Sequence, residues 1–257
     1  MRTSRHLITL FGSLLMLSGC SQPGTPTQVA VPPQPQANVI CNELSFYLNP
    51  SLGTEYECET VPESSDSDIP MDIFTYPEHT ELIINDYPLT QTQAITMIYV
   101  YPVERFSELL PDVLPRSVAD LNSYLSGGTL SSRELPFLPP MPLAQVFFSQ
   151  ETVLSFHGGQ GVRYLTQYNE FDNTINNKAI FYTFQGLTDD GMYWVTVTLP
   201  ISNPILPASN PLEGYTGSQN YDSYVREVKD ALDAQAPGSF NPNLNMLDNL
   251  VNSISVR

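Results

Sequence analysis

The chain has 257 residues, of which 27 are acidic and 10 are Lys or Arg, and its formal net charge is −17. Hydrophobic residues make up 41 % of the chain and charged residues 14 %. This is enough apolar material for a sizeable core and too little charge for a disordered polyelectrolyte. The acidic excess argues against a nucleic-acid partner, because phosphates require a basic surface.

The N-terminal residues have the pattern of an export signal. Arg2 and Arg5 make a basic start without acidic residues, and an apolar run of eleven residues follows at Leu7–Leu17. A helix needs about 20 residues to cross the hydrocarbon core of a bilayer. The run is therefore too short for a membrane span and is typical of a signal peptide.

Residues Leu17, Ser18, Gly19 and Cys20 resemble the bacterial lipobox, at which an exported chain is lipidated on its cysteine. The resemblance implies that residues 1–19 are a lipoprotein signal peptide and that Cys20 becomes an N-terminus acylated with chains such as palmitate. It also implies a location in the bacterial cell envelope, with a lipid anchor in the membrane and the domain on the extracytoplasmic side. An ordinary signal peptide, or a core helix with an unrelated cysteine, is the alternative.

A tether is expected after the lipidated cysteine, so that residues 20–38 separate the membrane from the domain. Ser21–Asn38 contains five prolines and no charged or aromatic residue. Such a segment cannot bury a core, and as polyproline II at about 3.1 Å per residue it would reach up to about 50 Å. The remaining residues, 39–257, suit one globular domain.

Cys41 and Cys58 are the two cysteines of the expected domain. An exported pair lies in an oxidising compartment, and the sixteen residues between them would close a loop worth about 3 kcal/mol in the chain-entropy model. We therefore predict a disulfide, with two independent thiols as the alternative. A metal site is not predicted, because no histidine accompanies the pair.

The segment Cys41–Asp86 carries eleven acidic residues and neither Lys nor Arg. Glu55, Glu57 and Glu59 alternate, so in a strand they would share one face. A cation or a basic partner could use that face, and a solvated surface is the alternative. Asp66-Ser67-Asp68 lacks the glycine and the closing glutamate of a calcium loop, so a calcium site is excluded.

The first half of the domain predicts strands at Leu44–Leu48, Glu81–Asn85 and Ala94–Tyr101. Short helices are predicted at Phe106–Leu110 and at Ser117–Leu125, the second with Ser117 as its N-cap. A proline-rich loop follows at Leu135–Leu143, and its apolar residues would serve packing or a partner.

The clearest pattern is a series of four runs rich in aromatic and β-branched residues. Turn signals at His157–Gly161 and Asp189–Gly191 separate two neighbouring pairs of these runs. The pattern predicts an antiparallel meander with one buried face. The runs are Val146–Phe156, Val162–Tyr168, Ala179–Phe184 and Met192–Leu199.

The C-terminus predicts a helix over Tyr221–Leu232 and a second helix with Asn241 as N-cap and Pro242 at its first position. Ser253–Val256 would return to the sheet. Strands followed by helices predict an α+β fold, an antiparallel sheet packed by helices.

Phe181–Leu199 and Asn243–Val256 resemble the PsbP/LpqN-like fold, in which helices sandwich an antiparallel sheet and a last helix leads into a short strand. The resemblance implies an αβα sandwich, and members of that fold are mostly binding or assembly factors. It carries no functional motif, so it implies the fold alone.

No catalytic residue, metal site or cofactor is predicted. The motifs G-x-S-x-G, H-E-x-x-H and C-x-x-C do not occur. His157, Asp189 and Asp190 fall in predicted turns. The glycines after His157 precede a strand pattern, whereas a phosphate loop would need a helix N-terminus there.

Arg163 stands between aromatic residues in a predicted strand, where it could pair with a carboxylate of the domain or hold an anionic ligand. Trp194 and Tyr182 could line an apolar pocket or belong to the core. We expect a lipid-anchored envelope protein with a non-catalytic binding or assembly domain and an envelope protein as partner. The alternative is an envelope enzyme, or a lipoprotein that binds a small ligand, with a pocket near Arg163 and Trp194.

Overall fold

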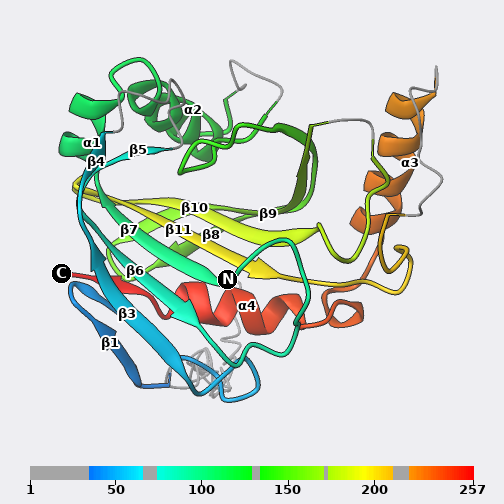
Figure 1. Ribbon diagram of the computed structural model, residues 1–257, viewed down its shortest axis with the longest axis horizontal. Coiled ribbons are helices and arrows are strands. Elements are labelled where there is room, and N and C mark those ends of the chain that lie inside the picture. The colour runs from blue at the N-terminus through cyan, green and yellow to red at the C-terminus, as the bar shows by residue number, and fades with distance from the viewer. Residues whose placement is uncertain (1–34, 66–73, 129–133, 171–172, 211–219) are drawn as a thin grey trace, which may run out of the picture. The chain divides into compact units, whose positions relative to one another are not determined.

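A seven-stranded antiparallel sheet forms the centre of the domain (Figure 1). The computed structural model describes residues 35–65, 74–128, 134–170, 173–210 and 220–257. The predicted signal peptide, Cys20, most of the tether and Asp66–Asp68 lie outside these ranges. In spatial order the strands are β3 (Tyr56–Val61), β6 (His79–Ile84), β7 (Met97–Pro102), β11 (Tyr193–Pro200), β10 (Phe181–Thr188), β9 (Gly159–Asn169) and β8 (Ala144–Phe156).

The predicted meander is confirmed, because β8, β9, β10 and β11 pair antiparallel in chain order. The prediction of one buried face is wrong, because successive residues of β9, β10 and β11 are buried and both faces of these strands are covered. Two turns reverse the chain at positions where the sequence places glycine. Gly158 in the β8–β9 turn has φ 80° and Gly191 in the β10–β11 turn has φ 71°. A side chain at either position would be strained, and this is why glycine favours these reversals.

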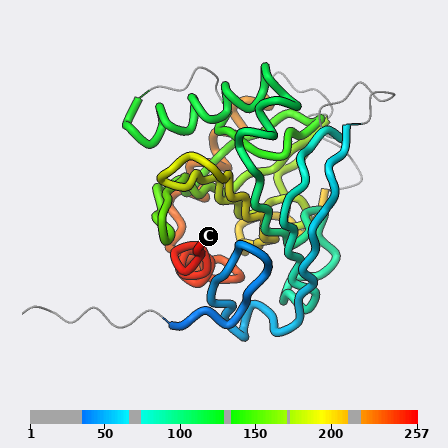
Figure 2. Tube along the Cα trace, turned by 90° about the vertical axis from the view of Figure 1, so that its left-hand side faces the viewer, coloured from blue at the N-terminus to red at the C-terminus, as the bar shows by residue number. Residues whose placement is uncertain are grey.

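Helices and a small sheet cover the two faces of the main sheet. One face carries α1 (Val103–Leu109) and α2 (Leu114–Leu125), whose Phe106, Leu114 and Leu121 pack against Tyr101, Tyr164 and Trp194. The opposite face carries α4 (Leu244–Asn252) and a sheet of β1 (Val39–Cys41), β2 (Leu44–Phe46) and β12 (Ser255–Val256). Figure 2 shows this layering, with α1 and α2 in green above the strands and α4 and β1 below them. The α+β class is therefore confirmed.

Three smaller elements complete the described residues. The helix α3 (Tyr221–Asp233) packs beside β8 at one end of the sheet (Figure 1). Strands β4 (Ser64–Ser65) and β5 (Thr75–Tyr76) pair with each other, and η2 (Pro237–Ser239) precedes α4. None of the helices described here is long and apolar enough to span a membrane.

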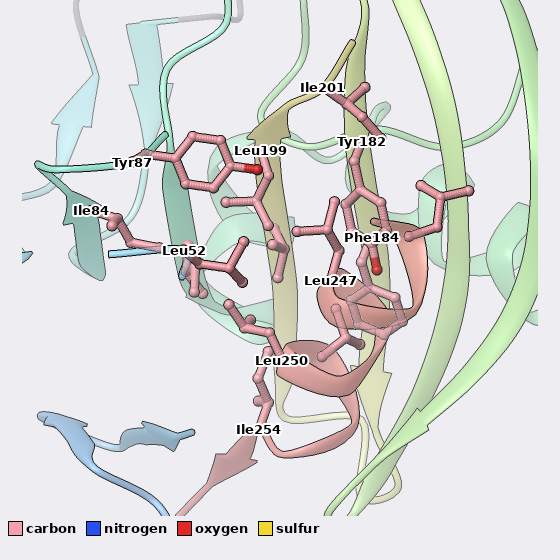
Figure 3. Packing of buried hydrophobic residues seen from close by; sticks show 14 of the residues in the cluster. Leu52, Ile84, Tyr87, Tyr182, Phe184, Leu199, Ile201, Leu247, Leu250 and Ile254 are labelled. Carbon is pink, nitrogen blue, oxygen red and sulfur yellow. The ribbon is translucent and has the colours of Figure 1, made fainter. Parts of the chain in front are cut away.

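The larger core lies between the sheet and α4. Leu247, Leu250 and Ile254 lie in one buried cluster with Tyr182 and Phe184 of β10, and Leu247 lies next to Phe184 (Figure 3). All five side chains are at most 2 % exposed. Full burial of a residue such as leucine stabilises a fold by about 1.5–3 kcal/mol, so these contacts hold the C-terminal helix on the sheet.

Three predicted helix starts are wrong. The helix α1 begins at Val103 and not at Phe106. The helix α2 begins at Leu114, and the Ser117 hydroxyl donates to the carbonyl of Val113 inside the helix at 3.2 Å. The helix α4 begins at Leu244, because the side chain of Asn243 accepts a hydrogen bond from the N–H of Asn245 at 2.9 Å. Asn241–Pro242 is a cis peptide before that cap.

The last strand also differs from the prediction. The strand β12 pairs with β2 of the small sheet, and within the described residues it meets the meander only at an isolated parallel bridge between Ser255 and His157. Since β2 belongs to the first described residues of the chain, this pairing brings the two ends of the domain together. Sequence patterns do not report such a pairing, because both segments are only two or three residues long.

Candidate functional site

The predicted disulfide is confirmed. Cys41 of β1 and Cys58 of β3 are bonded, with their Cα atoms 5.7 Å apart. The bond joins the small sheet to the edge of the main sheet, so it fixes β3 from the face that carries α4.

Arg163 of β9 forms a bidentate ion pair with Asp248 of α4. The Nε–Oδ1 distance is 3.0 Å and the Nη2–Oδ2 distance is 2.9 Å. The remaining terminal nitrogen, Nη1, donates to the carbonyl of Gln150. The Arg163 residue is 4 % exposed, so the pair is buried between sheet and helix.

Tyr182 completes this cluster. Its hydroxyl donates to Oδ1 of Asp248 at 3.1 Å, and its ring centroid lies 6.0 Å from the guanidinium carbon of Arg163. Burial raises the pKa of Tyr182 well above its ordinary value, so the hydroxyl keeps its proton and stays a donor. Arg163 and Tyr182 therefore converge on a carboxylate of the domain itself.

Gln150 was not identified from the sequence, yet it connects this cluster to α3. It lies at an irregularity of β8 between Ser149 and Thr152, with φ 55°. Its side-chain Nε2 donates to the carbonyls of Leu232, Asp233 and Gln235 at 2.7, 3.2 and 3.1 Å. Gln150 thus binds carbonyls at the end of α3, while its own carbonyl accepts from Arg163; the carbonyl of Leu232 also accepts from the N–H of Gln235.

Trp194 lies on the opposite face of the sheet. Its indole Nε1 donates to Oε1 of Gln185 at 2.9 Å, and that oxygen also accepts from the N–H of Leu138 at 3.0 Å. The indole packs with Phe106 and Leu114, whereas Arg163 faces α4. The structure does not bring Trp194 together with Arg163, because the sheet separates them.

The proline-rich loop Leu135–Leu143 lies over the Trp194 face and borders a groove. The rings of Phe137, Tyr168 and Phe181 form its floor, with centroid separations of 5.2, 5.9 and 6.1 Å. Two adjoining hollows of about 270 and 390 Å³ share Tyr168, Leu143 and Met141. We call this surface the aromatic groove.

The loop serves packing and also leaves apolar surface at the groove. Leu135 and Leu138 are buried, while Met141 is 39 % exposed. Burial raises the pKa of Tyr168, whose hydroxyl accepts from Nε2 of Gln145 at 3.0 Å. The aromatic floor of the groove is thus partly or fully buried, and Met141 supplies exposed apolar surface beside it.

The alternating glutamates lie at the free edge of the main sheet. Glu57 and Glu59 belong to β3 and Glu55 immediately precedes it, and all three are exposed. Among the described residues none of the three forms an ion pair, whereas Glu63, just after β3, pairs with Arg105 of α1 at 2.6 Å.

The predicted turn residues differ in their contacts, since Asp190 bonds within its own turn and the N–H of His157 donates to the carbonyl of Ile254 at 2.9 Å. Asp190 accepts from the Thr188 hydroxyl at 2.6 Å and from the N–H of Met192 at 2.9 Å, and these bonds lower the pKa of its carboxyl. Asp189 lies beside it in the turn, and His157 is exposed at the other turn. Within the described residues no group of three His, Cys, Asp or Glu side chains could hold a metal.

Comparisons of the chain with models of protein families, with curated proteins and with solved structures find no match.

Proposed function

We propose that the protein is a lipid-anchored component of the bacterial cell envelope and that its domain binds another protein without catalysing a reaction. The anchor rests on the basic start, the short apolar run and the lipobox-like residues that end at Cys20. Removal of residues 1–19 would take away two arginines and no acid, so the mature chain would be still more acidic. Anionic headgroups repel such a chain, and acyl chains rather than a basic patch would hold it.

The proposal that the domain catalyses no reaction is supported by the contacts of Arg163, Tyr182 and Trp194, the residues considered for a pocket. Arg163 and Tyr182 bond to Asp248, and Trp194 bonds to Gln185, all inside the packed domain. Their polar groups are therefore directed at other residues of the fold. Within the described residues, the aromatic groove and the edge of β3 are two surfaces that remain open to a partner.

A lipoprotein that binds a small ligand is the second candidate, and the aromatic groove is the observation that favours it. The larger hollow of about 390 Å³ falls within the size range of small-molecule sites. Its floor is aromatic, and polar groups of Gln93 and Asn169 lie at its border. A ligand in this place would lie on the Trp194 face and not beside Arg163.

For the fold we infer a relationship with PsbP-like domains. Support comes from the order of elements along the chain. The hairpin β10–β11 comes first, and the helix α4 and a short last strand come later, as in that fold. Helices on both faces of an antiparallel sheet agree with a sandwich. The relationship concerns the fold and adds nothing to the function.

Rescue of a deletion phenotype tests the proposed function. A tethered binding domain needs its reach, so removal of half of Ser21–Asn38 should impair rescue, since extended reach falls by about 3.1 Å per residue. His157→Ala, Asp189→Ala and Asp190→Ala should each rescue fully at matched expression. Loss of rescue by one of these turn substitutions, with the circular dichroism spectrum unchanged, would instead support an enzyme.

A further inference from the structure

The two edges of the main sheet differ in how open they are. The edge strand β8 has two register irregularities, at Gln145/Phe147 and at Ser149/Thr152, and α3 packs beside it. Such devices block pairing with another chain. The other edge strand, β3, pairs in regular register from Tyr56 to Val61, and within the described residues its only strand partner is β6.

The outward hydrogen-bonding groups of β3 follow from its pairing with β6. The N–H of Asn85 donates to the carbonyl of Glu55 at 2.9 Å, so Glu55 bonds toward β6. In an antiparallel pair, bonded and non-bonded residues alternate along each strand. The backbone N–H and C=O groups of Tyr56, Cys58 and Thr60 therefore point away from β6, toward the open edge.

Both ends of β3 and its centre are fixed to the domain. Before the strand, Asp86 accepts from the N–H groups of Thr54 and Glu55 at 2.8 and 2.9 Å. The Cys41–Cys58 bond holds the middle, and the ion pair between Glu63 and Arg105 holds the chain after the strand. Because β3 is already held in an extended conformation, binding of a partner strand would cost little conformational entropy in β3.

The charge of the edge selects the chemistry of the partner. Glu57 lies opposite Ile83 and Glu59 opposite Glu81, so Glu55, Glu57 and Glu59 share the face that carries α1 and α2. A second copy of β3 paired antiparallel would place glutamates against glutamates, and like charges directly opposite are destabilising. A strand with Lys or Arg at alternate positions would instead form opposite-charge pairs across the edge.

We propose that β3 is a docking edge for an extended, basic segment of an envelope protein, added as an eighth strand of the main sheet. The backbone of the segment bonds to Tyr56, Cys58 and Thr60, and its alternate basic side chains lie beside Glu55, Glu57 and Glu59. This inference rests on the proposed function, because it names where the domain binds a protein and what chemistry that protein presents.

A designed peptide, acetyl-Thr-Lys-Val-Lys-Val-Lys-Thr-amide with a fluorophore, is the probe. It is titrated against the full chain in a non-ionic detergent at low salt, and binding is followed by fluorescence anisotropy. The full chain should bind it saturably, with slower amide exchange at Cys58 and Thr60. Affinity should fall as salt rises, because exposed charges are screened.

Charge variants form the first comparison. The triple variant Glu55→Gln, Glu57→Gln, Glu59→Gln should bind the peptide about five- to tenfold more weakly, the sum expected for three exposed ion pairs. The matched control removes three exposed acids elsewhere, at Glu104→Gln, Asp222→Asn and Glu227→Gln, and should change the affinity by less than about twofold. Equal weakening in both variants would overturn the inference.

A backbone variant forms the second comparison. Thr60→Pro removes one outward N–H without removing a bond to β6, and should weaken binding further than Thr60→Val, which loses the same hydroxyl and keeps the N–H. Absence of saturable binding to the full chain, or equal affinity of these two variants, would also overturn the inference. The rescue assay with the shortened tether tests the proposed function separately, because it leaves β3 unchanged.

Discussion

Arg163 and Asp248 are 85 residues apart in the chain and form a two-bonded ion pair that joins β9 to α4. The side chains of the two residues are 5 % and 15 % exposed. Removal of one partner of such a pair leaves the other charge buried without compensation. The pair thus makes the C-terminal helix dependent on one strand of the meander.

Asp248→Ala should lower the free energy of unfolding by about 3–5 kcal/mol, because Arg163 then remains buried and unpaired. The double variant Arg163→Met, Asp248→Leu should recover most of that loss, since neither charge remains to be desolvated. Urea denaturation followed by circular dichroism measures both. A stable Arg163→Met variant that fails to rescue the deletion phenotype would point to an anionic ligand at Arg163 instead.

Gln150 should be as sensitive as a core residue, although it carries no charge. Gln150→Ala removes a side-chain donor from carbonyls at the end of α3 and keeps a side chain at φ 55°, so a loss of about 1–3 kcal/mol is expected. Gln150→Gly loses the same hydrogen bonds but tolerates the positive φ, so it should be the more stable of the two. Hydrogen exchange in α3 should be faster in both, and unchanged exchange there would refute the role of Gln150.

His79 should make stability depend on pH. The residue is 6 % exposed, and its ring lies 5.2, 5.3 and 4.5 Å from the rings of Tyr76, Tyr99 and Tyr101. Burial lowers the pKa of its imidazole below the ordinary value of 6.5, while the Pro77 carbonyl and Glu81 oppose the shift in part. The unfolded chain therefore binds a proton at a higher pH than the folded domain.

It follows that the free energy of unfolding is highest above pH 6.5 and falls as the pH is lowered toward the folded pKa of His79. His79→Gln should remove this dependence between pH 8 and 5.5, whereas His157→Gln, at an exposed turn, should retain it. Denaturation curves across that range measure the slopes. Identical slopes in the wild type and His79→Gln would contradict the assignment.

The disulfide should stabilise the domain by about 3 kcal/mol, because Cys41 and Cys58 are 17 positions apart and their bond restricts the unfolded chain. The variant Cys41→Ala, Cys58→Ala should lose that amount in urea denaturation. Alkylation of the wild type under denaturing conditions is the control for the bond itself, and free thiols at both positions would refute it.

The sequence predicted the meander because its signals are local. Aromatic and β-branched residues fill β8 to β11, and Gly158 and Gly191 provide the turns that join neighbouring strands. Helix starts were predicted less well. The sequence predicts Asn241 as the cap of the last helix, whereas the hydrogen bond from the N–H of Asn245 identifies Asn243 as the cap.

The candidate site was less predictable, because faces and long-range partners depend on register between strands. The sequence allows a pocket near both Arg163 and Trp194, yet the pairing of β9, β10 and β11 places them on opposite faces. Asp248 had no sequence feature that linked it to Arg163. Gln150 gave no turn signal, since its positive φ arises where β8 meets α3.

The proposed function requires a domain that works from a lipid anchor, and mass spectrometry of the mature N-terminus tests this directly. The protein is isolated from membranes of its host, and its N-terminal peptide is compared with that of a Cys20→Ala variant. We predict that the wild type begins at Cys20 and carries acyl chains, while the variant remains a longer precursor without lipid. A wild-type protein that is processed normally and carries no acyl group on Cys20 would contradict the account.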